Sequence, residues 1–246
     1  MQYLDTAQGR RIAYHRSEGR GPCIVFLGGL KSDMEGTKAV HLEAWAQAQG
    51  RAYLRFDYSG HGESSGTFEE GCIGDWHEDT VAAVQALTDG PIIVVGSSMG
   101  GWQALLLARA TPERIAGMVT IAAAPDFTED GYWASFTDAQ KQMLEDAGQV
   151  ELPSDYMEPY IITKRMIEDG RQRLVLRASL ELPFPVRCLQ GTADTAVSTE
   201  TALRLLDHAT CEDMRLTLVK DADHRFSDGP CLGMIEQAVL DVLREG

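Results

Sequence analysis

The chain lacks the features that mark several classes of protein. Its five cysteines form no Cys-x-x-Cys pair, and an odd number of scattered cysteines is typical of reduced thiols inside a cell. No apolar run is long enough to cross a bilayer, and the first residues, Met-Gln-Tyr-Leu-Asp, show neither the basic nor the apolar region of a signal peptide. We therefore expect a cytoplasmic protein with no stable membrane insertion.

Motifs for metals and nucleotide cofactors are also missing. The six histidines are dispersed, no His-Glu-x-x-His sequence occurs, and neither a Gly-x-Gly-x-x-Gly nor a Walker sequence is present. Those patterns supply the ligands of catalytic zinc, of dinucleotides and of nucleotide phosphates. We therefore expect no metal and no organic cofactor.

Positive charge is scarce in this chain. There are 37 acidic residues against 22 lysines and arginines, which gives a formal net charge of -15. Nucleic acids and anionic membrane surfaces are polyanions that attract basic proteins, so the composition argues against both as partners. With 246 residues, 44% of them hydrophobic, the chain is long enough for one globular α/β domain.

The most informative stretch is residues 91–102, Pro-Ile-Ile-Val-Val-Gly-Ser-Ser-Met-Gly-Gly-Trp. The β-branched run 92–95 suits a strand buried on both faces, and the residues from Trp102 onward suit a helix. Between them lies a Gly-x-Ser-x-Gly sequence centred on Ser98, whose glycines permit a sharp, closely packed turn. A serine in such a strand-turn-helix setting is typical of a nucleophile elbow. We therefore predict that Ser98 is a nucleophile, rather than a surface serine in a glycine-rich turn.

Strands and helices alternate along most of the chain. Such alternation, with nearly continuous apolar strands, favours a mostly parallel sheet covered by helices on both faces. The first 20 residues read as a hairpin. After it we expect strands at 22–27, 52–56, 92–95, 117–121, 186–190 and 214–219, and helices at 36–49, 73–87, 102–110, 201–208 and 229–244.

Residues 126–182 interrupt this alternation. They show no strong strand pattern and mix acidic side chains with aromatic and long apolar ones. We expect two helical pieces separated at 152–155, with Ser154 or Asp155 as the N-cap of the second. The insertion follows the carboxyl end of a strand, where open α/β sheets bind ligands, so it would roof an acyl-binding site. The alternative is a helical excursion that merely packs on the core. The predicted boundaries are an α/β core of residues 1–125 and 183–246 and a helical lid of residues 126–182.

Three residues suited to catalysis follow predicted strands, in the order serine, aspartate and histidine. Ser98 follows the strand at 92–95, Asp194 lies in the turn after 186–190, and His224 lies in the loop after 214–219. The carboxyl ends of parallel strands meet at one edge of a sheet, so the three side chains should lie together. A serine hydroxyl needs a histidine base, and that base needs a carboxylate to fix its orientation. We predict that Ser98 is the nucleophile, His224 the base and Asp194 the acid.

Three other residues offer alternatives for these roles. Asp221 and Asp223 are close to His224 in the sequence, but neither follows a separate strand that could bring it to the far side of the imidazole. His61 lies between two glycines with no carboxylate beside it, so we expect it to shape its loop rather than to act as the base.

A glycine pair ends the strand at 22–27. Gly28 and Gly29 let the following loop approach a substrate closely, at the position where this architecture builds half of an oxyanion hole. We therefore expect the backbone N–H of Leu30 to be an oxyanion donor, the alternative being an ordinary strand-to-loop turn.

These residues resemble the α/β-hydrolase superfamily over nearly the whole chain, and within it the mitochondrial acyl-protein thioesterases that also hydrolyse acyl glucuronides. Besides the elbow, similar stretches are Asp-Met-Glu-Gly-Thr-Lys-Ala at 33–39, Arg-Phe-Asp-Tyr-Ser-Gly at 55–60 and Asp-His-Arg at 223–225. The resemblance implies an α/β-hydrolase fold. It also implies Ser98, Asp194 and His224 as a catalytic triad, with oxyanion donors at Leu30 and Met99. The lid is the least similar part.

The sequence therefore predicts a serine hydrolase that cleaves carboxylic ester or thioester bonds through an acyl-enzyme intermediate. We expect small-molecule acyl esters or thioesters as substrates, with acylated proteins as a further class, and the apolar lid favours medium or long acyl chains. Two alternatives stay open: a carbon–carbon, lactone or peptide hydrolase using the same triad, and a non-catalytic ligand-binding protein on this fold. The second ranks last because all three triad residues are present.

Overall fold

A computed structural model describes residues 1–152 and 159–244 of the chain. Within these residues a single eight-stranded sheet, in the order β1-β2-β4-β3-β5-β6-β9-β10, organises the molecule. Its strands are β1 (Gln2–Asp5), β2 (Arg11–Ser17), β3 (Arg20–Leu27), β4 (Arg51–Phe56), β5 (Ile92–Ser97), β6 (Ile115–Ile121), β9 (Val186–Gly191) and β10 (Met214–Val219).

The strands from β4 to β10 in this order run parallel, and the β1–β2 hairpin joins them antiparallel at one edge. The central strand β5 is buried along its whole length, because helices cover both faces and its apolar, β-branched side chains suit that environment. The predicted mostly parallel sheet is confirmed.

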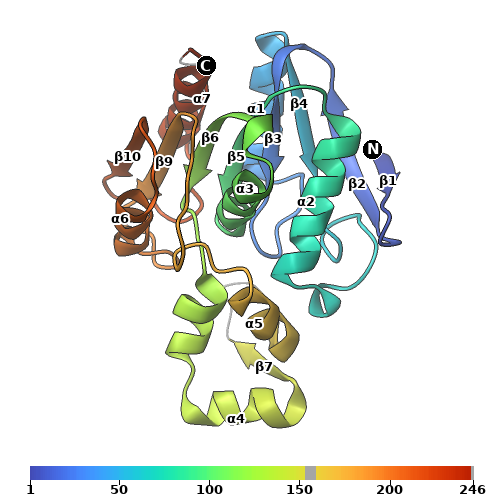
Figure 1. Cartoon of the computed structure of the whole chain (residues 1–246), viewed down its shortest axis with the longest axis vertical. Coiled ribbons are helices and arrows are strands. Elements are labelled where there is room, and N and C mark those ends of the chain that lie inside the picture. The colour runs from blue at the N-terminus through green and yellow to red at the C-terminus, as the bar shows by residue number, and fades with distance from the viewer. Residues whose placement is uncertain (153–158, 245–246) are drawn as a thin grey trace.

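Helices pack on the two faces of the sheet (Figure 1). In that view α2 and α3 lie in front of the sheet, whereas α1 and α7 lie behind it. Each face has its own cluster of buried apolar side chains. The helices are α1 (Thr37–Ala48), α2 (Ile73–Leu87), α3 (Met99–Ala110), α6 (Thr199–His208) and α7 (Gly229–Arg244), with short 3-10 turns η1 (Phe68–Glu70) and η2 (Pro112–Arg114).

Two helices begin shortly after candidate site residues: α6 after Asp194 and α3 after Ser98. Ser198 caps α6 by accepting a hydrogen bond from the backbone N–H of Thr201, as its position before that helix predicts. Helix α3 begins at Met99, three residues before the predicted start at Trp102. Glycine is a poor helix former, but here Gly100 and Gly101 form the first turn because the backbone packs too tightly for any side chain at either position.

Residues 126–182, which we call the cap segment, do not form a purely helical insertion. They contain a short antiparallel sheet in which Val150 pairs with Ile162, both of them buried. The expectation of two helical pieces with no strong strand therefore missed this short sheet. The predicted N-caps Ser154 and Asp155 lie outside the described residues, and the helix after the sheet is capped by Thr163. The elements are η3, a π-helix (Thr128–Trp133), α4 (Asp138–Ala147), β7 (Gln149–Leu152), β8 (Tyr160–Thr163) and α5 (Lys164–Arg171).

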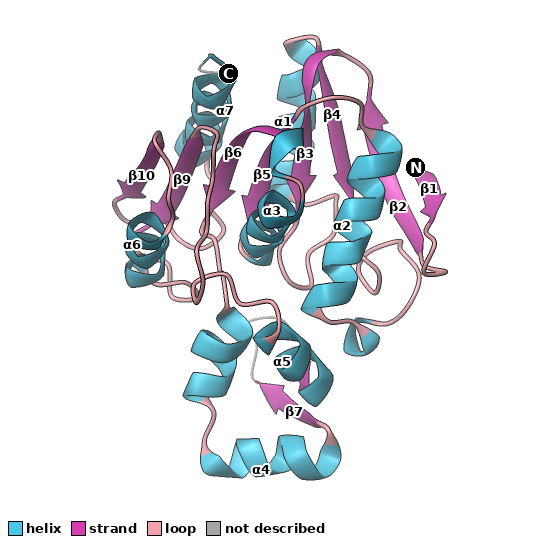
Figure 2. Ribbon diagram, in the orientation of Figure 1, coloured by secondary structure: helices cyan, strands magenta, loops and turns pink. Residues whose placement is uncertain are grey.

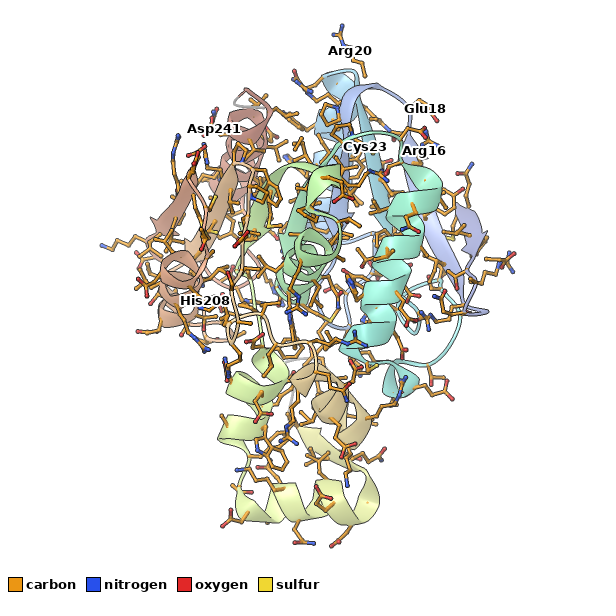
Figure 3. All side chains as sticks on the ribbon, viewed as in Figure 1. Arg16, Glu18, Arg20, Cys23, His208 and Asp241 are labelled. Atoms are coloured by element: carbon orange, nitrogen blue, oxygen red, sulfur yellow. The ribbon has the colours of Figure 1, made fainter. Side chains whose placement is uncertain are left out.

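The cap segment lies beyond the carboxyl ends of the parallel strands. Figure 2 shows the arrowheads of β5, β6 and β9 pointing toward the end of the molecule that carries α4, β7 and α5. Arg16, Glu18 and Arg20, labelled in Figure 3, lie at the opposite end. Any site formed where these strands end therefore lies between the sheet and the cap segment.

Asp126 ties the two ends of the cap segment together. Its side chain is fully buried, and its carboxylate accepts hydrogen bonds from the backbone N–H groups of Val175 (2.8 Å) and Leu176 (3.0 Å) and from the Arg177 guanidinium. The chain leaves the core at Asp126 and returns through these residues, so one carboxylate fixes both crossings.

No helix within residues 1–152 and 159–244 is long and apolar enough to span a membrane.

Candidate active site

Ser98 sits on a sharp turn between β5 and α3. Its φ of 56° and ψ of -119° lie outside the regions that residues other than glycine ordinarily occupy. Three backbone hydrogen bonds hold this conformation: the Ser98 N–H donates to the carbonyl of Ile121 (2.9 Å), and the Ser98 carbonyl accepts from the N–H groups of Gly101 (2.9 Å) and Ala124 (3.0 Å). The turn leaves the residue half-buried at the edge of the sheet.

The glycines around Ser98 are required by close backbone contacts. A Cβ at Gly96 would lie 2.3 Å from the carbonyl oxygen of Gly100, and a Cβ at Gly100 would lie 2.0 Å from the carbonyl oxygen of Leu27. Both separations are far below van der Waals contact. The Gly-x-Ser-x-Gly pattern is thus a steric requirement of this turn.

The structure brings together the three residues that the sequence analysis singled out. His224 Nε2 lies 3.2 Å from Ser98 Oγ, and His224 Nδ1 lies 2.8 Å from Asp194 Oδ2. The side chains come from the ends of three parallel strands, β5, β9 and β10, that lie far apart in the sequence. A hydroxyl, an imidazole and a carboxylate in this order can move a proton away from the hydroxyl.

Both carboxylate oxygens of Asp194 accept hydrogen bonds. Its side chain is shielded from solvent, and Oδ1 accepts hydrogen bonds from the N–H groups of Ala196 and Val197, both at 2.8 Å. Gln190 Nε2 donates to Oδ2 at 3.0 Å. Burial alone would raise the pKa of Asp194, but the hydrogen bonds from His224 and Val197 outweigh burial and lower the pKa. The carboxylate therefore stays ionised beside the imidazole.

Sequence reasoning missed Gln190. It is 1% exposed, and its amide Nε2 also donates to the carbonyl of Val197, which fixes the turn that carries Asp194. The signal that could have found it is a polar amide near the end of an otherwise buried strand, β9.

The two rival acids shape the His224 loop. Asp223 Oδ1 accepts a hydrogen bond from the N–H of Phe226 at 3.1 Å. Asp221 has a left-handed backbone, with φ of 61°, and its N–H donates to Thr192 Oγ1 at 2.9 Å. The carboxylate that contacts the imidazole is that of Asp194.

His61 lies in an aromatic cluster. It is 4% exposed, its Nδ1 is 3.2 Å from the carbonyl oxygen of Ser59, and its ring makes edge contacts with Tyr58, Phe68 and Trp76. Burial lowers the pKa of His61 to about 4, so the ring is neutral near pH 7. These contacts fit a residue that shapes its loop.

The two predicted oxyanion donors lie next to Ser98. Met99 is the first residue of α3, and Leu30 follows Gly29, where an added Cβ would lie only 3.3 Å from Ser98 Cβ. Neither N–H donates a hydrogen bond to another described residue. Their role in binding an oxyanion stays a prediction.

A cavity of about 650 Å³ opens away from this site. It is lined by residues 181–185 and 210–213, which precede β9 and β10 and so lie at the opposite edge of the sheet from Ser98. Across residues 1–152 and 159–244, no group of three or more His, Cys, Asp or Glu side chains could hold a metal ion.

Known proteins resemble this chain over almost its whole length. The family profile described as the alpha/beta hydrolase fold matches residues 40–160. The mitochondrial palmitoyl-protein thioesterase ABHD10 of mouse is 35% identical over 245 residues, covering 99% of this chain and 82% of that protein. The curated mammalian relatives are named as mitochondrial, whereas a cytoplasmic location for this chain stays a prediction.

Solved structures give the same result. Alpha/beta hydrolase domain-containing protein 10 from mouse superposes with a TM-score of 0.91 at 32% identity, covering 99% of this chain and 98% of that one. A candidate hydrolase from Agrobacterium vitis superposes with a TM-score of 0.93 at 37% identity, covering 99% and 97%. With relatives this similar over nearly its full length, the chain belongs to the α/β-hydrolase family.

Proposed function

We propose that this chain cleaves carboxylic ester or thioester bonds of acyl substrates, with Ser98 as nucleophile, His224 as base and Asp194 as the orienting carboxylate. Its family membership and its thioesterase relatives make it a hydrolase of the esterase and thioesterase type. The observation that carries the residue assignment is the unbroken contact from Ser98 Oγ through the imidazole to Asp194 Oδ2, at 3.2 and 2.8 Å.

The first half of the reaction would acylate Ser98. His224 Nε2 takes the hydroxyl proton as Oγ attacks the acyl carbonyl, and the carbonyl π electrons move onto oxygen. The N–H groups of Leu30 and Met99 bind that oxyanion, helped by the positive end of the α3 dipole. The bond to the alcohol or thiol then breaks, and His224 returns the proton to the leaving group.

The second half would release the acid. Water enters where the leaving group was, and His224 Nε2 takes one of its protons while the oxygen attacks the acyl carbonyl. Collapse of the second tetrahedral intermediate returns the proton to Ser98 Oγ. Through both halves the Asp194 carboxylate stabilises the imidazolium and keeps Nδ1–H directed away from Ser98.

We infer that residues 126–182 act as a lid over the acyl group, with residues 1–125 and 183–246 as the catalytic core. A series of aromatic rings supports this: Trp102 of α3 contacts Phe127, which contacts Tyr132, at centroid separations of 5.5 Å each. Phe127 and Tyr132 are only half-buried. Half-buried rings where the strands end suit a medium or long acyl chain. The naming of a relative as a palmitoyl-protein thioesterase points to thioesters, and to acylated proteins as one source of them.

The test compares Ser98→Ala with the wild type and with a matched neighbour, Ser97→Ala. Ser97 ends β5 and is buried. We would measure hydrolysis of p-nitrophenyl esters and of fluorogenic acyl thioesters of increasing chain length. Ser98→Ala should lose at least about 10⁴-fold in kcat, as triad serines do, while Ser97→Ala stays active.

Three results would contradict parts of the proposed function. Equal turnover by Ser98→Ala and the wild type would overturn the nucleophile assignment. An optimum at the shortest chain would contradict the lid as an acyl-binding roof. Failure of the wild type on every ester and thioester would leave the carbon–carbon, lactone, peptide and ligand-binding alternatives.

A further inference from the structure

Residues 33–39 have no part in the chemistry described so far, although their sequence is distinctive. Lys38 lies in the first turn of α1, on the face of the sheet opposite α2 and α3. Its Nζ donates a hydrogen bond to the backbone carbonyl of Arg225 at 2.5 Å, across 187 positions of the sequence. Arg225 directly follows His224, so Lys38 contacts the carbonyl of the residue after the proposed base.

The loop that carries His224 needs such external contacts. Asp221 and Phe226 flank the histidine, and both have left-handed backbones, with φ of 61° and 48°. This conformation is costly for residues with a side chain and persists only where surrounding contacts hold it. The Phe226 ring is fully buried, and its N–H donates to Asp223. Lys38 adds an ammonium group to these contacts, and a charged donor binds about twice as strongly as a neutral one.

The charge on Lys38 is sensitive to pH. Burial lowers the pKa of Lys38 to about 8, the Asp223 carboxylate opposes that fall, and the Arg225 guanidinium adds to it. From α7, the Cys231 thiol faces Lys38, and burial raises the pKa of that thiol to about 12. Helices α1 and α7 also contact each other through His41 and Glu236, whose Nε2 and Oε1 atoms lie 2.7 Å apart. Lys38 therefore loses its charge as the pH rises through about 8.

We propose that Lys38 is a positioning residue for His224: its ammonium holds the Arg225 carbonyl, keeps the imidazole directed at Ser98, and releases this hold when it deprotonates, so that turnover slows in alkaline solution. The inference rests on the proposed role of His224. In this proposal Lys38 does not contact the substrate, so its replacement should change kcat and leave KM unchanged.

The experiment is a pH–rate profile from pH 6 to 10 with a soluble ester, on the wild type, Lys38→Arg, Lys38→Met and a control, Lys220→Met. Lys220 is an exposed lysine that lies just before Asp221 in the same loop. The wild type and Lys220→Met should both lose kcat above about pH 8. Lys38→Arg stays charged, so it should keep its kcat through this range. Lys38→Met should have a kcat about tenfold lower at pH 7, equivalent to one lost charged hydrogen bond, an unchanged KM and no fall near pH 8.

Two outcomes would overturn the proposal. One is a Lys38→Met profile that still falls near pH 8, and the other is a Lys38→Met kcat at pH 7 equal to that of the wild type. If Lys38→Met fails to fold, the Ser98→Ala protein gives a second measurement by NMR. As the Lys38 side-chain signals titrate near pH 8, the His224 ring signals should shift with them, and their failure to do so would also overturn it. Undiminished activity of Ser98→Ala would instead refute the proposed function, which separates the two.

Discussion

Gln190 and His224 contact the same oxygen of Asp194. The amide Nε2 of Gln190 lies 3.0 Å from Asp194 Oδ2, and Nδ1 of the imidazole lies 2.8 Å from it. The two donors approach one carboxylate oxygen while backbone N–H groups occupy the other. The direction in which Asp194 faces the imidazole is thus set by a side chain inside β9.

Replacing Gln190 should affect the rate more than substrate binding. Gln190→Leu removes the donor to Oδ2 while keeping a side chain of similar size, so we expect kcat to fall about tenfold with KM nearly unchanged. Gln190→Glu sets a second carboxyl against Asp194, which raises the pKa of the pair and moves the acid limb of the pH–rate profile upward. Steady-state kinetics would check both, and wild-type kcat in Gln190→Leu would refute this positioning role.

His61→Phe should leave the pH–rate profile unchanged. The aromatic contacts survive the substitution, and the neutral ring of His61 does not titrate between pH 5 and 9 because the pKa is about 4. We expect kcat/KM within about twofold of the wild type, and a modest loss of stability because the contact with the Ser59 carbonyl is removed. His224→Phe is the matched comparison and should be inactive. A large loss of activity in a folded His61→Phe protein would reopen His61 as a candidate base.

Asp57 should make the folded state more stable in mild acid than a normal aspartate would. It is 2% exposed and accepts hydrogen bonds from the N–H groups of Met34 (2.6 Å) and Glu63 (2.9 Å). Burial, aided by the nearby carboxylates of Asp33 and Glu35 and opposed by those hydrogen bonds, raises the pKa of Asp57 from 3.8 to about 6.

The sign of the Asp57 effect follows from that raised pKa. Between about pH 4 and 6 the native state binds a proton that the unfolded state has lost, so this contribution is full below pH 3.8 and disappears as pH rises through 6. A shift of this size corresponds to about 3 kcal/mol. Urea unfolding of the wild type and Asp57→Asn at pH 4.5 and 7.5 would measure it. The wild type should lose stability relative to Asp57→Asn between pH 4.5 and pH 7.5. A difference between the two proteins that does not change with pH would contradict the prediction.

Asp126→Asn should loosen the cap segment. The variant keeps a residue that tolerates the φ of 59° at this position but loses one of the two carboxylate oxygens that bind Val175, Leu176 and Arg177. We expect a loss of about 1–3 kcal/mol in unfolding free energy and faster proteolysis within residues 126–182. Asp130→Asn is the matched control, because its carboxylate is 30% exposed and also pairs with Arg177. Its effect should be smaller, and equal effects would refute the special role of Asp126.

Much of the fold and of the candidate site could be predicted from the sequence because both depend on local patterns. The strand, the glycines and the first turn of the helix around Ser98 lie within twelve residues, and the order of Asp194 and His224 after later strands gives their common edge. Strands β3, β5 and β6 contain nearly continuous apolar runs, so their predicted ranges were close to those observed. Steric limits and burial restrict the residue types at neighbouring positions, so they can be recognised within short stretches of sequence.

The parts that escaped prediction depend on contacts between distant residues. In the sequence Lys38 is one polar position within a predicted helix, and only the fold brings it to Arg225. Gln190 carries no signal beyond its polarity inside a buried strand. The β7–β8 pairing joins strands of four residues each, which are too short to give a clear strand pattern between the helical patterns on both sides.

The pairing of β6 with β9 has a consequence for how such a molecule can change. These strands are neighbours in the sheet, with Met118 opposite Val186, although residues 122–185 separate them in the chain. In topological terms everything between them is a single long connection whose ends stay fixed. The connection can therefore be lengthened, shortened or replaced by that of another family member without any change in the order or pairing of the strands in the central sheet. The range of substrates can then change while the positions of the residues at the strand ends are kept.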